Sequence, residues 1–152
     1  AKEIFASIIN LDKQSAVWIA VRTLSVALTN EEWDGRVIFL CIVSECLFGT
    51  KNEISHKMSE RIAFFLLSNK EQAKRNFNRV KNLYNWRSNI VHGMRELNKS
   101  KYKNVKNSTL VLYHTEHFVR NALKKILCDQ ELIRKFNNNE EREKYLDNLI
   151  FS

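Results

Sequence analysis

The sequence predicts an all-α fold, a helical bundle of about five to seven helices, and three observations support it. The chain has no proline and only three glycines in 152 residues, whereas all-β domains of this size usually use both residues in their turns. Apolar residues recur at three- and four-residue steps, as in helices with one buried face. The composition, 44% hydrophobic and 28% charged, is that of a globular chain. We expect one domain over residues 1–152.

The N-terminal third contains the first predicted helices. Apolar residues at helical spacing predict a helix over Ala16–Leu28. A second helix is expected to start near Asn30, whose side chain can cap free backbone N–H groups, and to stop at Gly49. Residues 37–48 are apolar almost all round. We therefore expect this helix to lie at the centre of the bundle.

Two capping signatures predict the next helices. Segments 50–53 and 68–71 each begin with Thr or Ser and carry Glu three residues later, which is capping-box spacing. The first predicts a helix over 54–66. The second predicts a long helix to about His92, closed by Gly93.

The remaining elements follow a polar stretch. Residues 94–108 are rich in Lys and Asn and predict an exposed loop. A helix is expected over 108–127, although residues 109–113 have the composition of a strand. Asp129 and Asn138 can each cap a shorter helix after it.

Charge is the main compositional guide to partners. The formal net charge is +8 and the isoelectric point is near 9.5, which favours an anionic partner, nucleic acid before a membrane surface. Residues 51–107 hold 14 basic and 4 acidic residues, whereas the tail is acidic around residues 140–147. The asymmetry predicts one basic surface for such a partner.

Cysteine usage and hydropathy indicate the compartment. Cys41, Cys46 and Cys128 cannot form a paired framework, and the first two lie in an apolar run. The longest apolar stretch, 37–48, has 12 residues, against the roughly 20 that a bilayer requires. We therefore expect a cytoplasmic protein with no membrane partner. We also expect no metal and no other cofactor.

Segment 84–93 contains the residues best suited to chemistry, Arg87 and His92. Histidine is the side chain whose ordinary pKa lets it both take and give a proton near neutrality. Arginine offers a fixed fork of donors to a phosphate and stays charged. RNA carries its own nucleophile, the 2′-hydroxyl, so an imidazole and a guanidinium are enough to cleave it without a metal.

The five-residue spacing has a geometric consequence. On a straight helix Arg87 and His92 differ by about 140° around the axis and cannot meet squarely. Either the last turn unwinds before Gly93, or a second copy of the helix supplies facing partners in a symmetric dimer. The helical wheel places one stripe inward, made of Phe77, Val80, Tyr84, Arg87 and Val91. A neighbouring polar stripe holds Lys81, Asn85, Ser88 and His92.

The segment from Arg87 to His92 is an Arg-x4-His motif, and residues 83–93 around it resemble the ApeA-like branch of the HEPN superfamily. Segments 45–48 and 54–63 are also similar to that branch, and the resemblance covers roughly residues 35–130. It implies a HEPN-like helical domain that acts as a homodimeric, metal-independent endoribonuclease in antiviral defence or toxin-like RNA cleavage. Arg87 and His92 would be its catalytic residues. Members of the branch are often the C-terminal part of a longer protein, so an upstream regulatory domain or a partner protein is also expected.

Other residues are expected to support the motif. Ser88 and Asn89 would orient Arg87 and His92. Glu45 would help to orient Arg87 or His92 without contacting the RNA itself. Active members of the branch commonly have Asn, Asp or His after the motif Arg, where this chain has Ser88. That departure favours the alternative, a non-catalytic HEPN-type dimerisation or RNA- or nucleotide-binding module. The expected RNA-binding residues are Lys81, Arg95, Lys99, Lys101 and Lys103.

The motif residues also allow structural interpretations. A His in the last turn suits the helix dipole, and an Arg can pair with a buried acid. Glu45 could equally pair with Arg61 or face solvent. We favour structural roles for Glu45 and Arg61. The basic run 99–106 could follow a phosphate backbone or form a solvated loop.

Two further groups are expected to be structural. His114 and His117 lie three residues apart, but no third ligand lies at zinc spacing. We assign them to a solvated helix face. Trp18, Trp33 and Trp86 are expected to anchor the core or a dimer interface.

Overall fold

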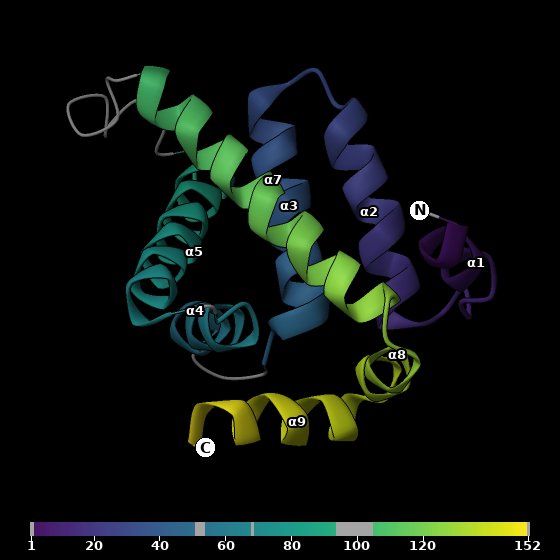
Figure 1. Ribbon diagram of the computed structural model, residues 1–152. Helices are drawn as coiled ribbons and strands as arrows, with labels where there is room; N and C mark the ends of the chain where they lie inside the picture. The colour runs from purple at the N-terminus through teal and green to yellow at the C-terminus, as the bar shows by residue number, and fades with distance from the viewer. Residues whose placement is uncertain (1, 51–53, 68, 94–104, 152) are drawn as a thin grey trace.

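The computed structural model describes residues 2–50, 54–67, 69–93 and 105–151. All regular secondary structure within these ranges is helical, which confirms the predicted all-α class. The described ranges contain eight helices, because a short N-terminal helix adds to the predicted ones. In chain order they are α1 (Lys2–Ile9), α2 (Ala16–Thr29), α3 (Trp33–Phe48), α4 (Ile54–Phe65), α5 (Lys70–Val91), α7 (Val105–Leu127), α8 (Gln130–Asn137) and α9 (Asn139–Phe151) (Figure 1).

Helix α3 lies at the centre of the bundle, as predicted. It runs between α2 and α5, and α7 crosses over it (Figure 1). Its side chains are buried almost all round, including Val37, Leu40, Cys41, Val43 and Leu47, each at most 1% exposed. A helix surrounded by others needs no polar face, which explains its continuous apolar run.

The start of α3 differs from the prediction. The helix begins at Trp33, and Asn30 does not cap it. Instead Asn30 Oδ1 accepts the backbone N–H of Glu32 at 2.8 Å, which closes the turn between α2 and α3. Asn, Asp and Ser side chains readily form such local turns, so the pattern was ambiguous between a turn and a cap.

Gly49 ends α3, as predicted. Its N–H donates to the carbonyl of Glu45 at 2.8 Å. A Cβ atom on Gly49 would lie 2.4 Å from that oxygen. The close approach of the two backbone segments therefore requires glycine at this position.

The caps of the later helices follow the predictions in part. Asn69, rather than Ser68, caps α5, with its Oδ1 accepting the N–H of Gln72 at 2.9 Å. Residues 51–53 and Ser68, which belong to the two predicted capping boxes, lie outside the described residues. Asp129 and Asn138 cap the starts of α8 and α9 as predicted.

Helix α7 starts earlier than expected. It begins at Val105, and residues 109–113 are helical despite their strand-like composition. Thr115 and Val119, on the buried side of α7, pack into the bundle. Tertiary packing of an amphipathic face outweighs the local propensity of β-branched residues. The rest of the predicted loop, 94–104, lies outside the described residues.

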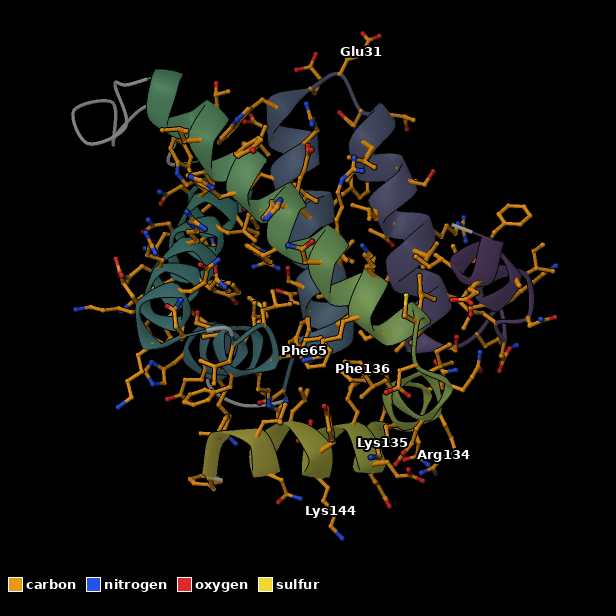
Figure 2. The ribbon with its side chains drawn as sticks, viewed as in Figure 1. Glu31, Phe65, Arg134, Lys135, Phe136 and Lys144 are labelled. Carbon is orange, nitrogen blue, oxygen red and sulfur yellow. The ribbon has the colours of Figure 1, made fainter. Side chains whose placement is uncertain are left out.

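An aromatic cluster joins α3, α4 and α8. The rings of Phe48, Phe65 and Phe136 lie with centroids 5.3–5.9 Å apart. Figure 2 shows Phe65 and Phe136 pointing toward each other at the level where these helices meet. Tyr145 of α9 packs on two of these rings. The C-terminal helices are thereby fixed to the end of the central helix.

Arg61 of α4 is fully buried and holds α9 in place. Its Nη2 donates to Asp147 at 2.8 Å and to Glu143 at 3.3 Å. Its Nη1 donates to the carbonyls of Gly49 at 3.1 Å and Phe48 at 3.4 Å. A charge removed from water needs such partners, so the structural role that the sequence favoured for Arg61 fits its surroundings.

Arg142 of α9 adds a further bond to the same region. Its Nη1 donates to the carbonyl of Cys46 at 2.9 Å. The last carbonyls of a helix have no partner within the helix. Two arginines from later helices therefore cap the C-terminal end of α3.

None of the described helices combines the length and the apolarity needed to cross a membrane.

Candidate functional site

Helix α5 carries the Arg-x4-His motif, and its buried face is rotated from the predicted stripe. The buried residues are Asn76, Val80 and Leu83. Val91, predicted to face inward, is 53% exposed, and Arg87 is half-buried. The wheel missed this phase because the buried face includes Asn76, which an apolar pattern does not count.

A tryptophan pair fixes the C-terminal part of α5 to the start of α3. The rings of Trp33 and Trp86 meet edge to face, with centroids 4.8 Å apart. Both side chains pack against the core, as does Trp18. The contact sets the position of Arg87, the next residue after Trp86.

Arg87 is half-buried without a carboxylate partner among the described residues. Its guanidinium carbon lies 5.7 Å from the ring centroid of Tyr84, one turn earlier on α5. A cation over an aromatic face is held without losing its charge or its donors. The guanidinium thus keeps hydrogen-bonding capacity for an anion.

The buried thiol of Cys41 contacts Glu45 and is influenced by the charge of Arg87. Cys41 Sγ donates to Glu45 Oε1 at 3.7 Å. Burial raises the pKa of Cys41 to about 12; the charge of Glu45 adds to the rise and that of Arg87 opposes it. The three side chains form what we call the α3–α5 polar cluster (Cys41, Glu45 and Arg87). Glu45 does not pair with Arg61, whose carboxylate partners lie on α9.

His92 closes α5 in the manner the sequence predicts. Its backbone N–H still donates to the carbonyl of Ser88 at 3.0 Å, so the helix keeps its regular hydrogen bonding to this point. Gly93 follows with φ of +63°, a left-handed conformation that glycine adopts at low cost. The imidazole of His92 is exposed.

The last turn of α5 does not unwind before Gly93, so unwinding does not bring Arg87 and His92 together. Within the described residues no hydrogen bond or ion pair joins the two side chains.

The other predicted site residues lie partly on α5 and partly outside the described residues. Ser88 and Asn89 are half-buried in the last turns of α5, beside Arg87, and Lys81 is exposed about two turns earlier. The predicted RNA-binding residues Arg95, Lys99, Lys101 and Lys103 lie outside the described residues.

The described helix α5 is strongly basic. It carries one acidic residue, Glu71, which pairs with Arg75. Its basic residues are Lys70, Lys74, Arg75, Arg79, Lys81 and Arg87. Six basic residues therefore belong to one helix of the bundle, and the single basic surface stays a prediction.

The histidine pair on α7 has more partners than the sequence indicated. His117 is exposed, whereas His114 is half-buried. Burial lowers the pKa of His114, and the charges of Arg79 and His117 lower it further. Tyr113 packs against both rings. Only the side-by-side packing of α5 and α7 reveals this group, since Arg79 is 35 residues from His114 in the chain.

Among the described residues, the His, Cys, Asp and Glu side chains form neither a metal-binding cluster nor a disulfide. No cluster of three or more His, Cys, Asp or Glu suited to a metal ion occurs among them. The cysteines are free: Cys41 is buried, Cys46 half-buried and Cys128 exposed.

No protein-family model, curated protein or solved structure matches the chain. The residues best suited to chemistry lie at the C-terminal end of α5. There an arginine with free donors and an exposed histidine share one basic helix. Such a pair can bind a phosphate and move a proton beside it.

Proposed function

We propose that this protein is a metal-independent endoribonuclease of HEPN type that acts as a homodimer, with Arg87 and His92 in a composite site. The observation that carries the proposal is the partial burial of Arg87, next to the core, without an ion-pair partner among the described residues. Arginines are seldom buried without a partner, and an RNA phosphate would supply one.

The end of α5 supports the dimeric form of the proposal. Arg87 and His92 point to different sides of a regular helix, so two facing helices are needed to place an arginine beside a histidine. Val91, between these sides, exposes 53% of its apolar surface, which a second copy would cover. A two-fold axis here would gather two arginines and two histidines around one cleft.

The proposed reaction needs only these groups. The imidazole of one His92 takes the proton of the 2′-hydroxyl, whose oxygen attacks the adjacent phosphorus. The bond to the 5′-oxygen breaks, and the second His92, in its protonated form, gives that oxygen a proton. Arg87 stabilises the negative charge that develops on the phosphoryl oxygens. The products carry a 2′,3′-cyclic phosphate and a 5′-hydroxyl.

The test is cleavage of mixed cellular RNA in EDTA. We expect the wild type to cut and both His92→Ala and Arg87→Ala to lose at least about a hundredfold in rate, the usual scale for a general acid–base or a charge-stabilising group. His56→Ala and Arg75→Ala are matched controls, because those side chains form local surface pairs with Glu60 and Glu71. Equal cutting by all variants would disprove the assignment.

The second candidate is a non-catalytic HEPN-type dimerisation or RNA- or nucleotide-binding module. Ser88, in the place where active members of the branch commonly have Asn, Asp or His, favours it. This candidate predicts RNA binding that His92→Ala leaves unchanged and no cleavage under any condition. Size-exclusion chromatography with light scattering would report the dimer in either case.

A further inference from the structure

The solvent side of α7 carries an aromatic and basic stripe. We call it the α7 stripe: Tyr113, His117, Arg120 and Lys124, spaced by four, three and four residues and all exposed. These steps keep the side chains on one side of a helix, over about 16 Å at 1.5 Å per residue. The stripe lies outside the proposed catalytic pair, on a different helix.

Tyr113 is the least expected member of the stripe. Its side chain is 65% exposed, although a tyrosine ring is largely apolar. The ring stacks on that of His117, at 14° between planes and 6.5 Å between centroids, and His114 meets it edge-on at 5.5 Å. Asn121 Nδ2 lies 3.1 Å from His117 Nε2 and holds that ring in turn. Tyr113 is thus an exposed ring with a fixed orientation, ready to stack on a planar ligand.

The basic members of the stripe have free charge. Arg120 and Lys124 form no ion pair within the described residues. The acidic residue of α7, Glu116, pairs instead with Arg36 of α3 and leaves the stripe without a carboxylate. Arg79 of α5, close enough to influence His114, adds a third cation at the edge. The stripe therefore has a positive potential beside its aromatic ring.

We propose that the α7 stripe binds single-stranded RNA, with an unpaired base stacked on Tyr113 and the following phosphates on Arg120 and Lys124. Alternation of a stacking ring with cations is the chemistry by which proteins hold single strands. A duplex keeps its bases stacked on each other and would gain only the phosphate contacts. This inference rests on the proposed function in naming RNA as ligand, and it adds the strand form and the surface that selects it.

The experiment measures binding without cleavage. All proteins carry His92→Ala, and fluorescence anisotropy follows a labelled single-stranded RNA of about 12 nucleotides, within the usual site size. We expect Tyr113→Ala to weaken binding about tenfold and Tyr113→Phe, which keeps the ring, by less than about twofold. Arg120→Ala and Lys124→Ala should each weaken binding and reduce the slope of log Kd against log salt by about 0.7.

Two control variants remove similar groups elsewhere. Phe5→Ala deletes an aromatic ring that is 67% exposed on α1. Lys144→Ala deletes a cation that points away from α9 into solvent (Figure 2). Neither should change the affinity by more than about twofold. The same RNA annealed to its complement should bind more weakly and show no loss with Tyr113→Ala.

The outcomes separate this inference from the proposed function. No binding of the single strand, an unchanged affinity in Tyr113→Ala, or equal losses in the control variants would overturn the α7 stripe as an RNA site. Cleavage by the wild type together with such a result would leave the nuclease proposal standing. Stripe-dependent binding without any cleavage by the wild type would support the stripe and overturn the nuclease.

Discussion

Two arginines near the central helix α3 have very different surroundings: Arg61 of α4 lies at the C-terminal end of α3, and Arg87 of α5 follows Trp86, which meets Trp33 at its start. Arg61 is fully buried and donates to two carboxylates and two carbonyls. Arg87 is half-buried and rests on the ring of Tyr84, with no carboxylate partner among the described residues. The first side chain has its hydrogen-bonding capacity largely used within the fold, and the second keeps it available.

The difference separates a structural arginine from a candidate functional one. Removing a buried charge from water is costly, and the fold compensates Arg61 with two carboxylates of α9 and two carbonyls at the end of α3. Arg87 has no comparable set of carboxylate and carbonyl partners among the described residues. An arginine without a carboxylate partner in the described ranges, on the same helix as an exposed histidine, is therefore the candidate ligand-binding residue.

The largest expected effect is on Arg61. Arg61→Ala should lower the free energy of unfolding by about 3–5 kcal/mol, because two carboxylates and the end of α3 lose their partner. Urea unfolding followed by circular dichroism measures it. A loss below about 1 kcal/mol would remove the contrast between the two arginines.

The next effect concerns Cys41, in the α3–α5 polar cluster. The folded protein holds the thiol proton up to a pKa of about 12, whereas the unfolded chain loses it near 9.0. Stability contributed by the neutral thiol is therefore full below pH 9 and is lost as the pH rises from 9 toward 12. We expect a fall of about 1.4 kcal/mol between pH 8 and 10 from this group.

Urea unfolding at pH 8 and pH 10 tests that expectation in wild type and Cys41→Ala. The variant removes the thiol and should show a correspondingly smaller fall in unfolding free energy. The same fall in both proteins would assign the pH dependence to other groups, such as Tyr145, whose pKa burial also raises.

A smaller effect distinguishes the two carboxylates that hold Arg61. Asp147→Asn should cost about 1 kcal/mol, since its oxygen lies 2.8 Å from Nη2 and its side chain is 37% exposed. Glu143→Gln should cost less, because its contact is 3.3 Å and its side chain is more exposed. Equal losses in urea unfolding would contradict this ranking.

The smallest expected change in stability is that of Arg87→Ala. Only the contact with Tyr84 and some packing are lost, so unfolding should shift by less than about 1 kcal/mol. Thermal unfolding beside the cleavage assay would show a folded protein without activity. A loss as large as that of Arg61→Ala would instead make Arg87 structural.

The sequence predicted the helices well where the signal was local. The caps at Asp129 and Asn138, the end of α3 at Gly49 and the end of α5 at Gly93 all depend on residues within one turn. Helix α1 was missed because a segment of only 8 residues carries little local signal. The register of α5 was wrong because its buried face includes a polar residue, Asn76.

The candidate site could be predicted only in its composition. The motif residues and their 140° separation follow from the sequence, and the regular end of α5 agrees with that geometry. The carboxylate partners of Arg61 lie 82 and 86 residues away, and Arg79, whose charge acts on His114, lies on a different helix, so no local pattern indicates them. That Arg87 has no carboxylate partner among the described residues follows only from the three-dimensional arrangement of its neighbours.

The capping of α3 by Arg142 has a consequence for synthesis of the protein in the cell. The bond from Arg142 to the carbonyl of Cys46 spans 96 residues. At the usual pace of a ribosome, about 5–20 residues per second, roughly 5–20 s pass between the emergence of these two residues. During that interval the carbonyl of Cys46 stays open to water, whereas Arg61 of α4 has already emerged to reach the carbonyls of Phe48 and Gly49. Completion of this cap is thus timed by translation rather than by helix formation, which takes under about a microsecond.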